Sequence, residues 1–214
     1  MNKEIKDGEL YEQRFGFKER KSNFRFITVL LFLVLLFLSF RVYWTENFGR
    51  VDVVGASMNM TLKNGDKLLM KYVEPNDLER SDVIVVSVEK YGRKDNTTHI
   101  IKRLIATEGE KVKCIDGNVY LCRKGQTEYD AEPLYEPYAF YRTEADKLSY
   151  DFGEYVVGEG EIFFLGDNRK NSVDSRYNEA QGSYLDCLYK ATDVVGVVPE
   201  WAIEHKTWIN KIFF

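Results

Sequence analysis

Two stretches of the sequence carry side chains that could act together as a nucleophile and its base. In GASMNMTL, Ser57 follows two small residues, which leave its hydroxyl and its backbone N–H accessible for attack and for oxyanion binding. In HIIKRLIA, Lys102 stands among isoleucine and leucine residues, where burial would favour the neutral amine that accepts a proton. Neither His99 nor His205 has a context that suggests a triad. Taken alone, the serine also fits a plain loop and the lysine an ordinary surface position.

A third stretch, LGDNRKNSVDSR, decides how the first two are interpreted. Its twelve residues contain a glycine, two asparagines, two aspartates, two serines and two arginines, more charge and more hydroxyl groups than a plain loop needs. Together with the S-M-x-x-T-L stretch and the Lys-Arg pair, after an N-terminal apolar segment, this motif resembles the type I signal peptidases of the single-anchor, Gram-positive kind. The resemblance extends over roughly residues 24 to 198.

The resemblance implies a membrane-bound serine endopeptidase with a Ser-Lys dyad in a β-rich catalytic domain. Such an enzyme cleaves N-terminal signal peptides from exported precursor proteins after small residues. Matched position by position, Ser57 would be the nucleophile and Lys102 the general base. Ser172 would hydrogen-bond the Lys102 amine and orient it, while Asp174 and Arg176 would form a supporting ion pair. A neutral hydroxyl suits this place, because a carboxylate beside the lysine would hold it as an ammonium.

Three departures from the family pattern concern the loops around these residues. Met60 stands where the family usually has proline, so a loosened turn predicts that Met60→Pro stabilises the domain by about 0.4 to 1 kcal/mol. If Met60 contacts substrate instead, the same change would alter which precursors are cut. The base motif KRLIATEGE lacks the usual first glycine, the proline and the terminal aspartate. Gly55 replaces a serine of some members, so the oxyanion hole would rest chiefly on the Ser57 backbone N–H.

The residues from Phe26 to Phe40, FITVLLFLVLLFLSF, contain no charge. Extended to Trp44, with Arg41 reaching the headgroups, the segment matches a bilayer core of about 30 Å. It predicts one transmembrane helix over residues 26–44. The alternatives are a buried core helix, against which the all-round apolar surface argues, and a cleaved signal peptide, which would need a small-residue cleavage site.

Charge around the span predicts its orientation. One acidic residue and four basic residues closely precede it, namely Glu19 against Lys18, Arg20, Lys21 and Arg25. The excess of positive charge places residues 1–25 in the cytoplasm. Residues 45–214 then form one extracytoplasmic catalytic domain of ordinary size, held at the cell membrane by a single pass.

The domain after the span is expected to be mostly β. Asp116-Gly117-Asn118 predicts a hairpin turn, residues 128–153 an irregular excursion, and residues 171–184 could hold a short helix. Short runs rich in β-branched and aromatic residues predict strands at Val51–Val54, Lys67–Tyr72, Val83–Val88, His99–Ile105, Lys111–Ile115, Val119–Cys122, Tyr155–Val157, Glu161–Leu165 and Val194–Val198.

Composition excludes several other classes of protein. Of the 214 residues, 44% are hydrophobic and 30% charged, as in a globular protein, and a net charge of −4 argues against a general nucleic-acid binder. Two histidines and three scattered cysteines do not suit a metal site, so we expect no metal and no cofactor. Cys114 and Cys122 flank the hairpin turn and either pair as a disulfide or stay independent. Cys187 is expected to be buried and inert.

The expected partners are therefore the signal peptides of secreted precursors and membrane lipid. The peptide would bind as an extended strand, with shallow pockets that admit only alanine-like side chains. The alternative is a signal-peptidase-like factor in pilin or surface-protein assembly, either noncatalytic or dedicated to few substrates. The altered loop at Met60 hints at it, but Ser57, Lys102 and Ser172 argue against a noncatalytic one. A self-cleaving repressor of related fold is disfavoured, because the N-terminus offers an anchor and no DNA-binding helices.

Overall fold

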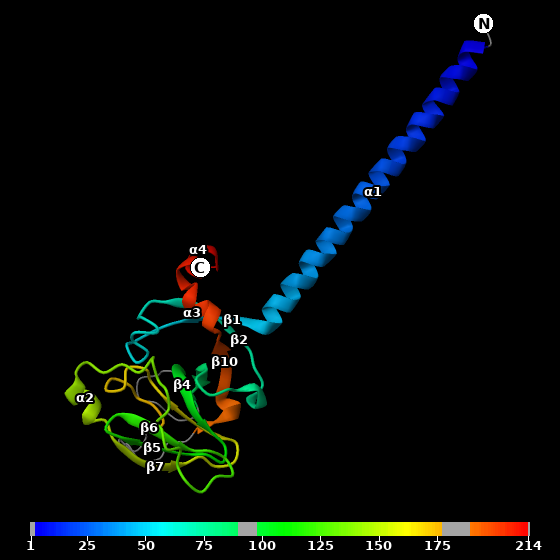
Figure 1. Cartoon of the computed structure of the whole chain (residues 1–214). Helices are drawn as coiled ribbons and strands as arrows, with labels where there is room; N and C mark the ends of the chain where they lie inside the picture. Colours follow the sequence, from blue (N-terminus) through cyan, green and yellow to red (C-terminus); the bar gives the residue numbers. More distant parts are fainter. Residues whose placement is uncertain (1–2, 90–97, 177–188, 214) are drawn as a thin grey trace. The chain divides into compact units, whose positions relative to one another are not determined.

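The computed structural model describes residues 3–89, 98–176 and 189–213, with the side chains of the first helix described from residue 23. The chain divides into two compact units, one ending at Asn47 and the other beginning at Phe48. Figure 1 shows a single long helix in the first unit and a body of strands in the second.

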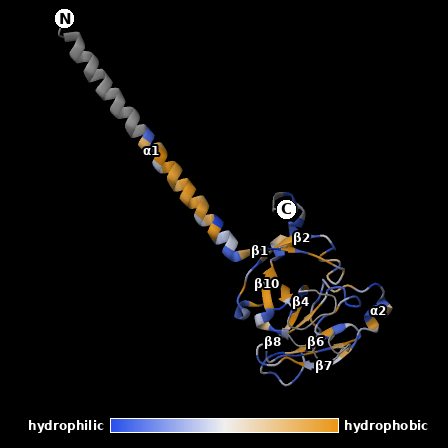
Figure 2. Ribbon diagram, turned by 180° about the vertical axis from the view of Figure 1, so that it is seen from behind, coloured by the Kyte–Doolittle hydropathy of each residue, from blue (hydrophilic) through white to orange (hydrophobic). Residues whose placement is uncertain are grey.

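The first unit is one helix, α1 (Lys3–Asn47). Its stretch Asn23–Asn47 is long and apolar enough to cross a membrane, with a mean hydropathy of 2.4 and none of its most apolar window buried. Figure 2 shows this run of hydrophobic residues along the helix. The expected N-terminal apolar helix is therefore present, and so large an exposed apolar surface is typical of a segment that contacts lipid.

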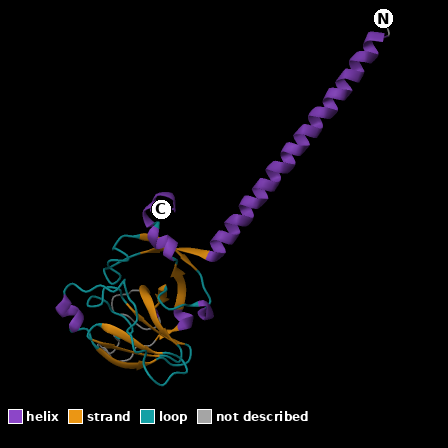
Figure 3. Ribbon diagram, in the orientation of Figure 1, coloured by secondary structure: helices purple, strands orange, loops and turns teal. Residues whose placement is uncertain are grey.

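The second unit is built on antiparallel strands, which confirms the prediction of a mostly β domain. Only short helices accompany the strands among the described residues (Figure 3). The strands are β1 (Phe48–Asp52), β2 (Lys67–Lys71), β3 (Val83–Ser87), β4 (His99–Thr107), β5 (Lys111–Ile115), β6 (Asn118–Cys122), β7 (Phe152–Val156), β8 (Glu161–Leu165), β9 (Tyr189–Lys190) and β10 (Val194–Val198).

The strands form two sheets whose cores meet at β4 and β8. A seven-stranded sheet has the order β1-β2-β10-β3-β4-β8-β9, and a three-stranded sheet has the order β6-β5-β7. Ile105 and Leu165 pack in one buried cluster with residues of β5 and β6, whereas Leu104 and Phe164 pack in another with residues of β3. Neighbouring residues of a strand face opposite sides. Strand β4 is thus held on both faces, which makes it a rigid carrier for Lys102.

Some boundaries differ from those expected. The first strand ends at Asp52 rather than Val54, because Val53 O accepts from the Gly65 N–H at 2.8 Å instead of from its cross-strand partner Asp66, whose N–H donates to Lys63 O. Strand β4 continues to Thr107, and β9 was not predicted. The hairpin turn is confirmed: Asp116 and Gly117 have φ values of 49° and 72°, the left-handed backbone that a two-residue turn of this kind requires.

Helices α3 (Glu200–Glu204) and α4 (Lys206–Phe213) were also not predicted. Each helix is too short for a helical period to stand out in the sequence. Each nevertheless buries one side chain fully, Ala202 in α3 and Ile209 in α4. The excursion over residues 128–153 holds one short helix, α2 (Glu144–Leu148). Residues 171–176 are not helical, and the rest of that segment, with Cys187, lies outside the described residues.

The two cysteines beside the hairpin turn do not form a disulfide. Both are free and buried. In the β5–β6 ladder Cys114 lies opposite Val119 and Cys122 opposite Lys111, so the two thiols are not cross-strand partners. Burial raises the pKa of the Cys114 thiol to about 12, and its Sγ donates to Tyr150 O at 3.0 Å. Both residues therefore act as small buried side chains.

Candidate active site

Ser57 and Lys102 lie side by side, although 44 residues separate them in the sequence. Lys102 Nζ lies 2.9 Å from Ser57 Oγ and donates a second hydrogen bond to Ile101 O at 2.9 Å. The serine comes from the loop between β1 and β2, and the lysine from the middle of β4, opposite Ile84 of β3. A hydroxyl within hydrogen-bond distance of an amine is the arrangement that a nucleophile and its base require.

The pair opens onto a cleft of about 730 Å³. Lys102 itself is only 4% exposed, so its amine is largely shielded from water. The lining mixes apolar and polar residues in similar measure. Besides the reactive pair, it includes Val53, Val54, Gly55, Ala56, Met58, Ile100, Ile101 and Val173, and the polar residues Asp52, Thr98, His99, Lys170, Asn171 and Ser172. Such a cleft has room for an extended segment of chain beside the two reactive atoms.

Residues 166–176, called here the segment after β8, hold the serine loop in place. The serine loop is the connection between β1 and β2, residues 53–66. The Asn168 backbone N–H donates to Ser57 O at 2.9 Å, and Asn168 Nδ2 donates to Ala56 O at 3.0 Å. Asn168 is only 3% exposed, so both bonds are shielded from water. The peptide groups on both sides of Ser57 are thereby fixed, which holds its side chain beside Lys102.

Gly166 allows the serine loop and the segment after β8 to approach closely. A Cβ at this position would lie 2.2 Å from Ser172 Oγ, 2.5 Å from Ser172 Cβ and 2.7 Å from Ser57 O. All three are closer than non-bonded contacts allow. Only glycine fits here without moving the backbone of the candidate nucleophile.

Ser172 lines the cleft beside Lys102, but it does not make the expected hydrogen bond. Its Oγ is buried and has no hydrogen-bond partner among the described residues. The Lys102 amine is instead oriented by Ser57 and by its own strand, through Ile101 O. The Ser172 side chain packs over Gly166, and its orienting role toward Lys102 stays a prediction.

Asp174 and Arg176 form the expected ion pair. Arg176 Nε donates to Asp174 Oδ1 at 2.7 Å, and the Asp174 side chain is fully buried. The same carboxylate accepts the Gly166 backbone N–H at 3.2 Å, and Arg176 Nη2 donates to Arg169 O at 3.2 Å. Burial tends to lower the pKa of Arg176, but the Asp174 charge outweighs it and raises that pKa above its usual range. The pair therefore stays charged and ties both ends of the segment together.

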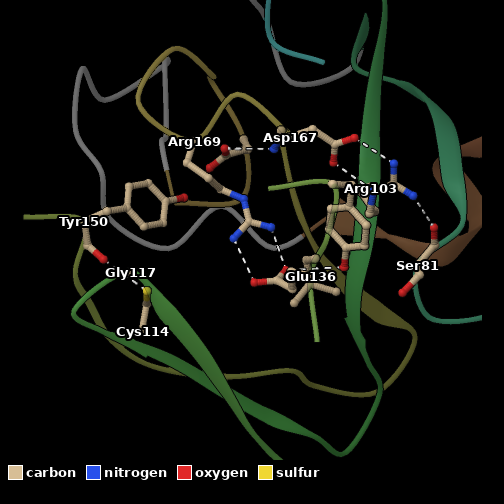
Figure 4. Close-up of polar contacts among 12 residues, drawn as sticks. Ser81, Arg103, Cys114, Gly117, Glu136, Tyr150, Asp167 and Arg169 are labelled. Atoms are coloured by element: carbon tan, nitrogen blue, oxygen red, sulfur yellow. Dashed lines mark hydrogen bonds and ion pairs between the residues drawn. The ribbon is translucent and has the colours of Figure 1, made fainter. Parts of the chain in front are cut away.

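A second buried ion pair joins β4 to the same segment. Arg103 Nε and Nη2 donate to the two oxygens of Asp167 at 2.8 and 2.7 Å, and Arg103 Nη1 donates to Ser81 O at 2.8 Å (Figure 4). Thr61 of the serine loop also donates to Asp167, at 2.5 Å. The Arg103 guanidinium stacks on the Tyr138 ring at 3.9 Å, and burial raises the pKa of that phenol to about 12. The pair thus links β4 and the segment after β8 to the serine loop, to Ser81 before β3 and to Tyr138.

A third buried ion pair holds residues from the excursion against the segment after β8. Arg169 Nη1 and Nη2 donate to the two oxygens of Glu136 at 3.0 and 2.6 Å (Figure 4). The Arg169 side chain is fully buried, and the opposing charge of Glu136 raises its pKa against the effect of burial. Two backbone hydrogen bonds of Phe140, to Asp167 and Arg169, extend this contact.

Comparison with known proteins identifies the family. The family model described as "Signal peptidase, peptidase S26" matches residues 23–206. The chain belongs to this family. Signal peptidase I of Bacillus licheniformis is 30% identical over 167 residues, 74% of this chain and 80% of that protein. Signal peptidase I P of Bacillus subtilis subsp. natto is 31% identical over 183 residues, 84% of this chain and 89% of that protein.

Two further similarities are more limited in extent. Signal peptidase I T of Bacillus subtilis strain 168 is 33% identical over 159 residues, 70% of each chain. A crystal structure of a signal peptidase I from Enterococcus faecalis V583 is 26% identical, with a TM-score of 0.41, and the match covers 57% of this chain and 97% of that one.

Membership of the signal peptidase family confirms the class of enzyme expected from the motifs. The family and its signal peptidase I relatives indicate a serine protease that processes signal peptides. The family and the apolar helix together indicate association with a membrane.

Met60 has a conformation that the sequence did not indicate. Its φ is 79°, in the left-handed region, and its side chain is 68% exposed. Proline is confined to φ near −65°, so it cannot replace Met60 without rebuilding this turn. The expectation that Met60→Pro stabilises the domain is therefore wrong: it assumed a turn that proline could adopt.

Sequence reasoning missed several residues that support the site. Asn168, Asp167 and Arg103 lie inside the motifs, but their partners could not be read from spacing. Glu136 lies in the stretch expected to be irregular, where no local pattern distinguishes it from a surface carboxylate. Its only signal was the neighbouring run of tyrosines and prolines, which suggests a loop that packs on something.

Proposed function

We propose that this protein is a membrane-bound endopeptidase that cuts signal peptides from exported precursors with Ser57 as nucleophile and Lys102 as general base. The distance of 2.9 Å between Lys102 Nζ and Ser57 Oγ carries the proposal, because proton transfer needs this contact. The burial of the lysine adds support, since the base must be a neutral amine when it accepts the proton.

The first half of the reaction acylates the serine. The neutral Lys102 amine accepts the Ser57 hydroxyl proton as Oγ attacks the scissile carbonyl carbon. The Ser57 backbone N–H stabilises the oxyanion of the tetrahedral intermediate. The Lys102 ammonium then protonates the leaving amine, so the mature protein departs with a free N-terminus and the signal peptide stays on Ser57 as an ester.

The second half releases the signal peptide. Lys102, neutral again, takes a proton from a water molecule that attacks the ester carbonyl, and then returns it to Ser57 Oγ as the ester bond breaks. The hydrogen bond to Ile101 O keeps the amine beside Oγ throughout. Because the base must be unprotonated, we expect the rate to rise with pH as the Lys102 amine loses its proton.

The supporting residues hold the walls of the site. We assign the ion pair of Asp174 and Arg176 to the support of Gly166, through the hydrogen bond to its N–H. Ser172 supports the cleft wall next to the lysine. We assign the preference for small residues at the cut to the cleft wall near the reactive pair, which Ala56 and Ile101 line.

The proposed topology is a single pass with residues 1–25 in the cytoplasm and the catalytic domain outside. The excess of basic residues before the span supports this orientation. Membrane lipid around the span then keeps the domain near the place where signal peptides emerge. Protease added to intact spheroplasts should digest the β domain. Protection until the membrane is opened would reverse the assignment.

The test of the dyad is turnover of a precursor in detergent by the wild type, Ser57→Ala and Lys102→Met. Both variants should lose cleavage while their melting temperatures stay close to that of the wild type. Their effects should not add in the double variant, because the two groups act as a unit. A wild-type rate in either single variant would refute the dyad. A wild-type protein that binds precursors without cutting them would favour the noncatalytic alternative.

A further inference from the structure

The loop that carries Ser57 is closed at its base. It joins β1 to β2, and its two ends meet where the Val53 N–H donates to Asp66 O and the Gly65 N–H donates to Val53 O, both at 2.8 Å. Within the loop, the Leu62 N–H donates to Met58 O at 2.8 Å. These hydrogen bonds connect the residues of the loop to one another, so a contact at one point can affect the position of Ser57.

The middle of this loop is strained and exposed. Met60 has the left-handed φ of 79°, which side chains other than glycine disfavour, and it contributes little packing because it is 68% exposed. On the side of Ser57 the loop is held by Asn168 and Asp167. The buried side chains of Met58 and Leu62 anchor the loop in the core, and a further polar contact lies on the side away from Asn168.

That polar contact comes from Lys206 of the C-terminal helix α4. Lys206 Nζ donates to Asp66 Oδ2 at 2.7 Å and to Thr61 O at 3.3 Å. One ammonium thus joins two points of the loop, directly after Met60 and at the base. The side chains of Lys206 and Asp66 are 25% and 17% exposed, so the ion pair is only partly screened by water.

Helix α4 is itself anchored on the domain. Ile209 is fully buried, and α3 and α4 lie beside β2 (Figure 1). The ammonium of Lys206 therefore projects from a fixed helix. The family match ends at residue 206, the first residue of α4, so most of this helix lies beyond the matched family domain.

We propose that Lys206 is a positioning residue for the reaction: by holding Thr61 O and Asp66, it keeps the loop in the conformation that places Ser57 Oγ beside Lys102. The inference rests on the proposed role of Ser57. It assigns to the C-terminal helix a part in catalysis that requires no contact with substrate.

The test uses the full chain in detergent with three variants. Lys206→Met keeps the length of the side chain and removes its charge, and Lys206→Arg keeps the charge. Lys211→Met removes a charge from the exposed side of the same helix and is the matched control. We expect Lys206→Met to lower kcat about tenfold with KM within about twofold, as for loss of positioning. Lys206→Arg should recover most of the rate, and Lys211→Met should behave as the wild type.

Hydrogen exchange at the Val53 and Leu62 amides tests the tether without using activity. Lys206→Met should speed exchange at both, and Lys211→Met at neither. Unchanged exchange, or faster exchange with a wild-type kcat, would overturn the inference. So would equal losses in Lys206→Met and Lys211→Met. Activity in Ser57→Ala would instead refute the proposed function, and the exchange data would still decide whether Lys206 holds the loop.

Discussion

Gly166→Ala should damage both catalysis and the stability of the fold, because the added Cβ would press on the loop that carries Ser57. The added Cβ would lie 2.7 Å from Ser57 O, whereas a carbon and an oxygen normally approach to about 3.3 Å, so the Ser57 carbonyl must retreat by about 0.6 Å. A displacement of 1 Å costs about 100-fold in rate, so 0.6 Å predicts a loss of about tenfold to twentyfold in kcat/KM. Overpacking of this buried position should cost about 1 to 3 kcal/mol of stability.

The control is Gly153→Ala. Gly153 lies on β7, where nothing stands within 4 Å of an added Cβ. This change should leave the rate unaltered and raise stability slightly. The assay is cleavage of one precursor in detergent, with thermal unfolding of both variants. A wild-type rate for Gly166→Ala would show that the loop of Ser57 does not depend on the close contact at Gly166, and the reasoning would fail.

Three further predictions concern stability. Asp167→Asn should cost about 3 to 5 kcal/mol in urea unfolding, because it leaves the buried Arg103 guanidinium without a carboxylate; a loss below 1 kcal/mol would contradict this. Met60→Gly should match or raise the melting temperature, because the relief of left-handed backbone strain offsets the greater chain entropy of glycine in the unfolded state. Met60→Pro should lower the melting temperature, because proline cannot adopt this φ. A higher melting temperature for Met60→Pro than for Met60→Gly would refute the argument from φ. Burial raises the pKa of the Cys114 thiol to about 12, whereas the same thiol in the unfolded chain has a pKa of about 8.5. Between these two pH values only the unfolded state loses the thiol proton, so the free energy of unfolding should fall as the pH rises through this range. Cys114→Ala should flatten that part of the stability curve.

The type of fold and the chemistry could be predicted because they depend on local pattern. An uncharged apolar run predicts a membrane helix wherever it occurs, and short β-branched runs separated by turn residues predict strands. The turn at Asp116 and Gly117 was predictable for the same reason, since few residues tolerate a left-handed backbone.

The contacts that hold the site depend on residues far apart in the chain. Arg103 with Asp167, Arg169 with Glu136 and Lys206 with Asp66 each join separate elements. No spacing rule connects a charged residue to its partner across 30 residues or more. The partner is chosen by the packing of the sheets, which must satisfy each buried charge.

By itself, the sequence determined the class of this protein: an apolar anchor, a β domain, and three motifs with the residue types of a serine peptidase. Only the tertiary structure decided that Lys102 contacts Ser57, that Ser172 does not bond the lysine, that the cysteines stay apart and that Met60 is left-handed. The physical reason is that residue type limits which reaction is available. Strand register and side-chain packing set the distances between atoms, and these emerge only when the whole chain is folded.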